Sequence, residues 1–233
     1  YYFKKNADLI FTETDDVNLR VTKLLNFEKE QVYTVSNTLN GLLKNSNCYD
    51  YSILDRLPTK EPNDIWLVTI SHNYPHKNLE VIKELVTVLP PCYKFILTVS
   101  SDFLQLVPKE HRERVITIGN ATLSQCAPLY EVCDGLFMPT LLECFSASYL
   151  EAMYMKKIIF TSDLPFAHTV CKDAAFYFAP HDVENIRSTL VNGFQNKEIL
   201  NHKLNEGSKI YESFPSAKAR ALQYIDIIKS NLV

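Results

Sequence analysis

The amino-acid sequence predicts an α/β protein built on a doubly wound parallel sheet. Two observations support this prediction: short apolar runs alternate with amphipathic stretches along most of the 233 residues, and each apolar run has the length of a buried strand. Strands separated by helices imply right-handed βαβ units and therefore a parallel sheet. Ligands bind such sheets outside the carboxyl ends of the strands, so each strand-to-helix loop is a candidate functional site.

The N-terminal part of the chain contains one short βαβ pattern. We expect a strand at 7–12, a helix over 13–26 with one apolar face, and a second strand at 31–35. Residues 36–62 are rich in Asn, Ser, Asp and Pro, and they predict a long irregular linker. This linker is the best candidate for a domain boundary.

From Ile65 onward the alternation becomes regular and predicts one large domain. Each apolar run is bounded by turn residues, and most are followed by a stretch with helical periodicity. The expected strands lie at 65–70, 93–99, 115–118, 135–138, 157–161 and 176–178. The expected helices lie at 78–89, 122–132, 146–155, 182–193, 196–212 and 216–230.

Composition excludes several classes of function. The net charge is −3 and basic residues form no broad field, so nucleic acid is not an expected partner. No apolar run is long enough to cross a membrane. Six cysteines occur without a CxxC pair, which argues against a zinc ribbon or a redox dithiol and fits a reducing cytoplasm. There is no clear Asp-x-Asp motif, and we expect no metal site.

The loop Ser71–Asn78 follows a strand and opens a helix. Lys77 lies at this helix start, where the helix dipole disfavours a positive charge. A bound anion would resolve this conflict, because helix N-termini and lysines both bind phosphate. His72 in the same loop is a further candidate donor, charged only if its pKa is raised. The alternatives are a solvated surface lysine and a structural histidine in a turn.

The loop after the strand at 135–138 carries two acids, Glu143 and Glu151, with Ser146 as the expected N-cap of the next helix. Eight residues along a helix advance about 12 Å, so the two carboxylates cannot share a proton. They suit two separate polyol groups of one elongated ligand, although two unrelated surface acids would show the same spacing. Cys144 is a poor nucleophile candidate, because no histidine and acid are known to contact it.

Together these motifs resemble the donor site of family 4 retaining glycosyltransferases, which have the GT-B fold. Pro75–Leu79 is similar to the family's P-x-K-N segment, and residues 139–153 are similar to its loop with two glutamates. The resemblance follows the family's order of motifs over most of the chain. It implies a Rossmann-like donor-binding domain at 63–233, a linker at 41–62, and the last βαβ unit of an N-terminal acceptor domain at 1–40.

The resemblance also implies residue roles. Lys77 would contact the donor diphosphate and Glu143 the hydroxyls of the transferred sugar, and these two are the expected catalytic residues. Glu151 would hold the ribose hydroxyls. The other expected donor-binding positions are His72, the backbone amides at Phe145 and Ser146, and the loop Gly119–Asn120, which would lie near the base.

Three positions depart from the family pattern. Ser71-His72 stands where the family often has Gly-Arg, and Cys144-Phe145-Ser146 stands where it has Gly-Phe-Gly. Thr169, beside His168, occupies a position that is often Glu. The lost glycines reduce backbone freedom beside the sugar, so these changes bear on donor identity and affinity more than on the fold.

The resemblance implies transfer of a hexose or N-acetylhexosamine from a nucleotide-diphosphate sugar, with UDP favoured and GDP possible, and without a metal or tightly bound cofactor. The acceptor would be a saccharide or lipid-linked saccharide of a bacterial surface polysaccharide (O-antigen or capsule), reached in the cytoplasm or at the inner face of the membrane. This chain alone is expected to bind donor, to transfer nothing, and to self-associate through its exposed N-terminal unit. A nucleotide-sugar 2-epimerase and a non-catalytic nucleotide-binding subunit are the alternatives.

Overall fold

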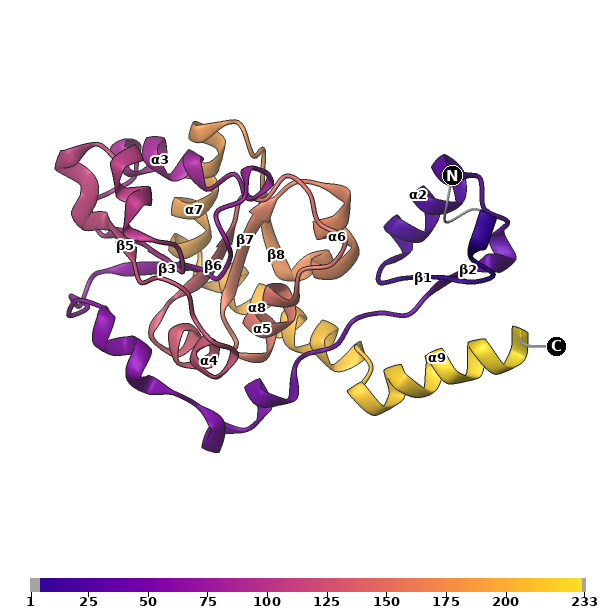
Figure 1. Ribbon diagram of the computed structural model, residues 1–233. Helices are drawn as coiled ribbons and strands as arrows, with labels where there is room; N and C mark the ends of the chain where they lie inside the picture. Colours follow the sequence, from indigo (N-terminus) through magenta and orange to yellow (C-terminus); the bar gives the residue numbers. More distant parts are fainter. Residues whose placement is uncertain (1–4, 232–233) are drawn as a thin grey trace.

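A six-stranded parallel sheet forms the centre of the protein in the computed structural model, which describes residues 5–231 (Figure 1). The strand order is β5-β4-β3-β6-β7-β8, and all five neighbouring pairs are parallel. This confirms the predicted α/β class and doubly wound sheet. The strands are β3 (Ile65–Thr69), β4 (Tyr93–Leu97), β5 (Val115–Thr117), β6 (Gly135–Met138), β7 (Ile158–Ser162) and β8 (Ala175–Phe178).

Helices cover both faces of the sheet, and the burial pattern of β3 shows why. Trp66 and Val68 point into one apolar core and Leu67 into the other, so both faces of this strand need a covering layer. The first core packs under α4 (Leu123–Val132), α5 (Ala147–Tyr154), α6 (Pro165–Cys171) and α8 (Lys197–Ser213). The second packs under α3 (Ile82–Val88) and α7 (Val183–Gln195).

The N-terminal unit stands beside this domain (Figure 1). It consists of β1 (Ile10–Thr12), α2 (Asp15–Leu25) and β2 (Val32–Thr34), with the two strands paired in parallel. The C-terminal helix α9 (Ala217–Asn231) runs from the sheet domain to this unit (Figure 1). Phe11 packs edge-on against Tyr224 of α9, with ring centroids 4.9 Å apart. The predicted βαβ pattern is therefore correct, and α9 anchors it.

The linker differs from the expected irregular loop. It forms 3-10 turns at Gly41–Lys44, Ser46–Cys48 and Tyr51–Arg56, each opened by an Asn or Asp side chain that caps a backbone amide. Leu43 and Ile53 are fully buried in the core on the α4 side. The polar residues therefore start the turns, while the apolar residues between them pack into the sheet domain.

Several short elements also differ from the sequence prediction. The helix expected at 78–89 begins only at Ile82, because Asn78 adopts a left-handed conformation (φ 53°) that ends a preceding turn. Helix α6 was not predicted, since two turns give too short a periodic pattern. The remaining 3-10 turns lie at Lys29–Gln31, Pro75–Lys77, Leu79–Val81, Ser101–Leu106, Lys109–Arg114 and Lys172–Ala174.

The direction in which strands are added to the sheet reverses between β3 and β6. Only two residue pairs, Leu67–Gly135 and Val68–Leu136, join the two strands in register. Beyond them the Thr69 hydroxyl donates to the Phe137 carbonyl at 2.6 Å. Because connections leave such a point in opposite directions, sheets of this kind bind ligands there, and we expect the ligand crevice at the carboxyl ends of β3 and β6.

Candidate functional site

Two loops flank the crevice, one following β3 and the other following β6. The Leu141 amide donates to the His76 carbonyl at 2.7 Å, and the Thr140 hydroxyl donates to the same carbonyl at 3.1 Å. Thr140 is only 1% exposed, so these bonds are shielded from water. The two loops are therefore joined directly at the point where the strand order reverses.

Lys77 and Glu143 meet across this junction. The Lys77 ammonium forms an ion pair with Glu143 Oε1, and the two side chains are only 17% and 13% exposed. Thr140 Oγ1 lies 3.5 Å from the same carboxylate oxygen. Asn78 fixes the base of the loop by donating to the Pro180 carbonyl at 2.9 Å. The structure thus brings together the two residues that the sequence predicted as catalytic.

The N-terminus of α5 lies just beyond Glu143. Ser146 occupies the predicted N-cap, but its hydroxyl makes no capping bond, so it leaves the amides of the first turn free of a side-chain acceptor. Such amides are donors for an anion. Phe145 is half-buried, and its ring packs edge-on against Phe214 with centroids 6.0 Å apart. A phosphate-like group at this position would face a helix N-terminus that begins three residues after Glu143, the partner of Lys77.

Glu151 occupies a different environment further along α5. It is 7% exposed, and the Tyr130 hydroxyl donates to its Oε2 at 3.1 Å. Burial raises the pKa of the Glu151 carboxyl, while the Tyr130 hydrogen bond partly opposes this shift. No contact described here joins Glu151 to Lys77 or Glu143. Its predicted place at the far end of an elongated ligand stays a prediction.

The predicted base-side loop contains a left-handed turn. Gly119 has φ +71°, a conformation that favours glycine, and its amide donates to the Val99 carbonyl at 3.0 Å. Arg56 of the linker donates to the carbonyls of Ile118 (2.9 Å) and Asn120 (3.5 Å). The sequence did not predict that Arg56 contacts this loop, because the position of Arg56 depends on how the linker packs.

The positions that depart from the family pattern have local partners. His72 is exposed, and its ring lies 5.7 Å from that of Tyr74. The Thr169 hydroxyl donates to the Pro165 carbonyl at 2.9 Å. His168 pairs with Asp163 at 2.5 Å and stacks on Tyr177. None of these contacts identifies a replacement for the family's arginine.

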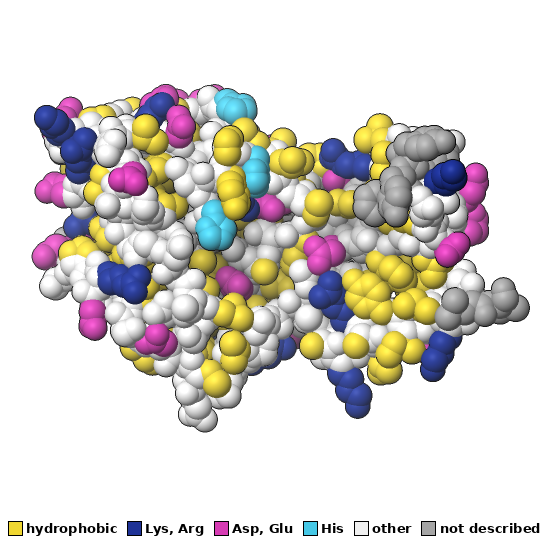
Figure 2. Space-filling view, viewed as in Figure 1, with side chains coloured by type: hydrophobic (Ala, Val, Ile, Leu, Met, Phe, Trp, Pro, Cys, Tyr) yellow, Lys and Arg dark blue, Asp and Glu magenta, His cyan; other side chains and the backbone are white. Residues whose placement is uncertain are grey.

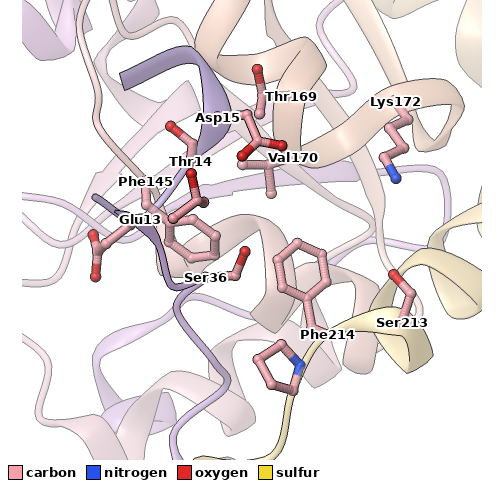
Figure 3. A pocket seen from close by; sticks show the side chains of 12 residues that line it. Glu13, Thr14, Asp15, Ser36, Phe145, Thr169, Val170, Lys172, Ser213 and Phe214 are labelled. Atoms are coloured by element: carbon pink, nitrogen blue, oxygen red, sulfur yellow. The ribbon is translucent and has the colours of Figure 1, made fainter. Parts of the chain in front are cut away.

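Two cavities border the loop that carries Glu143. One, of about 200 Å³, lies between the N-terminal unit and the sheet domain, and Figure 3 shows the rings of Phe145 and Phe214 and the hydroxyl of Ser36 around it. The other, of about 260 Å³, is lined by Glu143, Cys144 and residues of α2 and α6. The N-terminal unit therefore contributes walls to both spaces beside the site.

Two further kinds of site, metal centres and membrane spans, are absent from the described part of the chain. Among residues 5–231 there is no group of three or more His, Cys, Asp or Glu side chains that could hold a metal ion. No helix in the described part of the chain has the length and apolar character needed to cross a bilayer. All six cysteines are free thiols, and Cys144 is exposed.

Comparison with known proteins identifies the fold. A glycosyltransferase from Rickettsia africae superposes with a TM-score of 0.79 at 12% identity, covering 99% of this chain and 66% of that one. Anabaena HepE, solved with UDP and glucose, superposes with a TM-score of 0.78 at 15% identity, covering 98% of this chain and 65% of HepE. The fold is that of a GT-B glycosyltransferase. The GT-B resemblance inferred from the sequence is thereby confirmed.

Sequence comparison adds one curated relative. The O-antigen chain mannosyltransferase RfbU of Salmonella typhimurium is 22% identical over 194 residues, which cover 81% of this chain and 51% of RfbU. The chain thus spans about half the length of the relative that it matches. No family model matches the sequence.

Proposed function

We propose that this chain is the donor-binding part of a retaining glycosyltransferase that uses a nucleotide-diphosphate sugar. The observation that carries the proposal is the Lys77–Glu143 pair at the crevice between β3 and β6. A lysine suits a diphosphate, and a carboxylate suits the hydroxyls of a sugar. The pair therefore places a group for the diphosphate, Lys77, next to a group for the sugar, Glu143.

The proposed chemistry follows from these two groups. Charge builds on the nucleotide diphosphate as it leaves, and Lys77 with the free amides of α5 would stabilise that charge. Glu143 would hold the transferred hexose or N-acetylhexosamine by its hydroxyls. Glu151 would bind the ribose and the loop at Gly119–Asn120 the base. We propose that these groups stabilise the leaving diphosphate without a metal ion.

The biological setting is proposed from the relatives. RfbU is named for O-antigen chain synthesis, so we place this protein in the assembly of a surface polysaccharide, with a saccharide or lipid-linked saccharide as acceptor. HepE was solved with UDP, which favours a UDP-sugar as the donor. RfbU is named a mannosyltransferase, so GDP-mannose has to be tested beside the UDP-sugars. Such acceptors would bring the protein to the cytoplasmic side of the membrane.

Calorimetric titration of the chain with UDP, UDP-sugars and GDP-mannose tests donor binding. Lys77→Gln removes the positive charge but keeps a donor for Glu143, so the loop should stay in place. Loss of a charge-assisted hydrogen bond costs about 1.5–3 kcal/mol, or roughly 10- to 150-fold in Kd. Lys83→Gln is the matched control, because Lys83 lies on α3 and pairs with Glu80 at 3.5 Å.

Four outcomes would overturn parts of the proposal. Absence of nucleotide binding by the unaltered chain, or equal effects of the two lysine changes, would remove the donor site. Transfer of sugar to a lipid-linked acceptor by this chain alone would contradict the proposal that it binds donor without turnover. Conversion of a UDP-N-acetylhexosamine into its 2-epimer would replace the transferase by an epimerase.

A further inference from the structure

The loop after β3 carries three aromatic rings in a row. His72, Tyr74 and His76 alternate along the chain, with ring centroids 5.7 Å apart for the first pair and 5.8 Å for the second. The rings of Tyr74 and His76 are nearly parallel, at an interplanar angle of 17°. Figure 2 shows histidine and apolar side chains side by side on this face, near the middle of the view. We call these three residues the aromatic row.

His72 and Tyr74 are exposed and His76 is half-buried, although the backbone of the row is held by hydrogen bonds. Tyr74 is 54% exposed, so the ring is not placed there by packing in the core. The Tyr74 carbonyl accepts from the Lys77 amide at 2.9 Å, and the His76 carbonyl accepts from Thr140 and Leu141 of the other loop. A single exposed aromatic ring needs no explanation, but three neighbouring rings on a fixed loop, one pair stacked and one tilted, do.

We propose that the aromatic row binds one face of an acceptor sugar ring. The C–H face of a pyranose is apolar and packs on an aromatic ring, while its hydroxyl rim needs hydrogen-bond partners. Tyr74 offers the apolar surface, and the imidazoles on either side can donate or accept hydrogen bonds at the rim. The row itself contains no carboxylate, which suits a neutral sugar.

The position of the row favours the acceptor over the donor. This inference rests on the proposed function, in which Lys77 holds the diphosphate and Glu143 the transferred sugar. The Tyr74 carbonyl accepts from the Lys77 amide at 2.9 Å, so the row lies on the same short turn as the residue expected at the diphosphate. The base is expected at Gly119, after β5, and two strand spacings separate β5 from β3, or about 9–10 Å.

Saturation-transfer NMR of this chain tests the inference directly. The probes are the methyl α-glycosides of mannose, glucose and galactose, each with excess UDP present. We expect saturation of the C–H protons on one face of at least one sugar. Tyr74→Leu should reduce that signal at least five-fold, and Tyr74→Phe should retain it. Tyr51→Leu is the control, because Tyr51 is similarly exposed (49%) but lies on the linker.

The outcomes separate this inference from the proposed function. No saturation of any probe by the unaltered chain, or equal loss in Tyr51→Leu, overturns the acceptor role. A fall in UDP affinity on Tyr74→Leu, measured by calorimetry, would assign the ring to the donor nucleotide instead. Failure of the chain to bind UDP while Tyr74-dependent sugar saturation persists would overturn the proposed function and leave a sugar site. Normal UDP binding without Tyr74-dependent saturation would overturn the acceptor role of the aromatic row and leave the proposed function in place.

Discussion

Glu151→Gln is expected to stabilise the free protein near pH 7 and at the same time to weaken nucleotide binding. The carboxyl is 7% exposed and burial raises its pKa above the ordinary value of 4.5. Gln has the same shape and can still accept the hydrogen bond from Tyr130. The substitution therefore removes a buried charge without removing packing or leaving the hydroxyl unpaired.

The effect on stability has a definite dependence on pH. Because the folded state holds the Glu151 proton more tightly than the unfolded state, unfolding free energy falls as pH rises from about 4.5 to the folded-state pKa. Each unit of difference between the two pKa values corresponds to about 1.4 kcal/mol. Gln has no proton to lose, so the advantage of the variant should be near zero at pH 4 and reach a plateau at neutral pH.

Urea unfolding at pH 4 to 8 measures the gain in unfolding free energy of Glu151→Gln. Titration with UDP measures its loss of nucleotide affinity. Loss of hydrogen bonds from ribose hydroxyls to a charged acceptor should weaken binding by about 1.5–3 kcal/mol, or roughly 10- to 150-fold. Glu110→Gln, on an exposed surface turn, should change neither quantity. A variant that is less stable than the original at pH 7 would refute the reasoning about the buried charge. A variant that binds UDP equally well would refute the reasoning about ribose binding.

Three further predictions concern stability and association. Lys172→Gly should raise unfolding free energy by about 1 kcal/mol in urea, because Lys172 has φ 45° and ψ −119°; an unchanged value would argue against strain. Gly193→Ala should destabilise by about 1–3 kcal/mol, since its Cβ would lie 2.6 Å from the Phe160 ring, whereas Gly41→Ala meets nothing within 4 Å and should be neutral. Light scattering should show concentration-dependent self-association that Leu24→Lys reduces, because Leu24 is 78% exposed; a strictly monomeric profile at high concentration would contradict this.

The sequence predicts best where one local pattern decides the structure. The runs from Ile65 onward are buried on both faces of the sheet, so their composition alone marks them as strands. The two loops that hold Lys77 and Glu143 follow strands that proved to be neighbours, and the rule for parallel sheets therefore places both at one crevice. This is why the contact between the two residues could be anticipated without coordinates.

The features that were missed depend on distant parts of the chain. Leu43 and Ile53 lie among polar residues, and only the tertiary fold shows that the linker packs under α4. The contact of Arg56 with the loop at Gly119 follows from that packing. Thr140 joins the two loops through the carbonyl of His76, 64 residues away, and no spacing pattern in the sequence records such a bond.

The ion pair between Lys77 and Glu143 has a consequence for selectivity. Each charge is largely shielded from water, so removing the partner of either one leaves a poorly compensated charge. A ligand that offers only a phosphate would satisfy Lys77 but would leave Glu143 without its cation. A ligand with an anion and adjacent hydroxyls can replace both halves of the pair at once. The proposed donor, a sugar linked to a diphosphate, has both groups, and on this argument it should displace the pair at lower cost than inorganic phosphate.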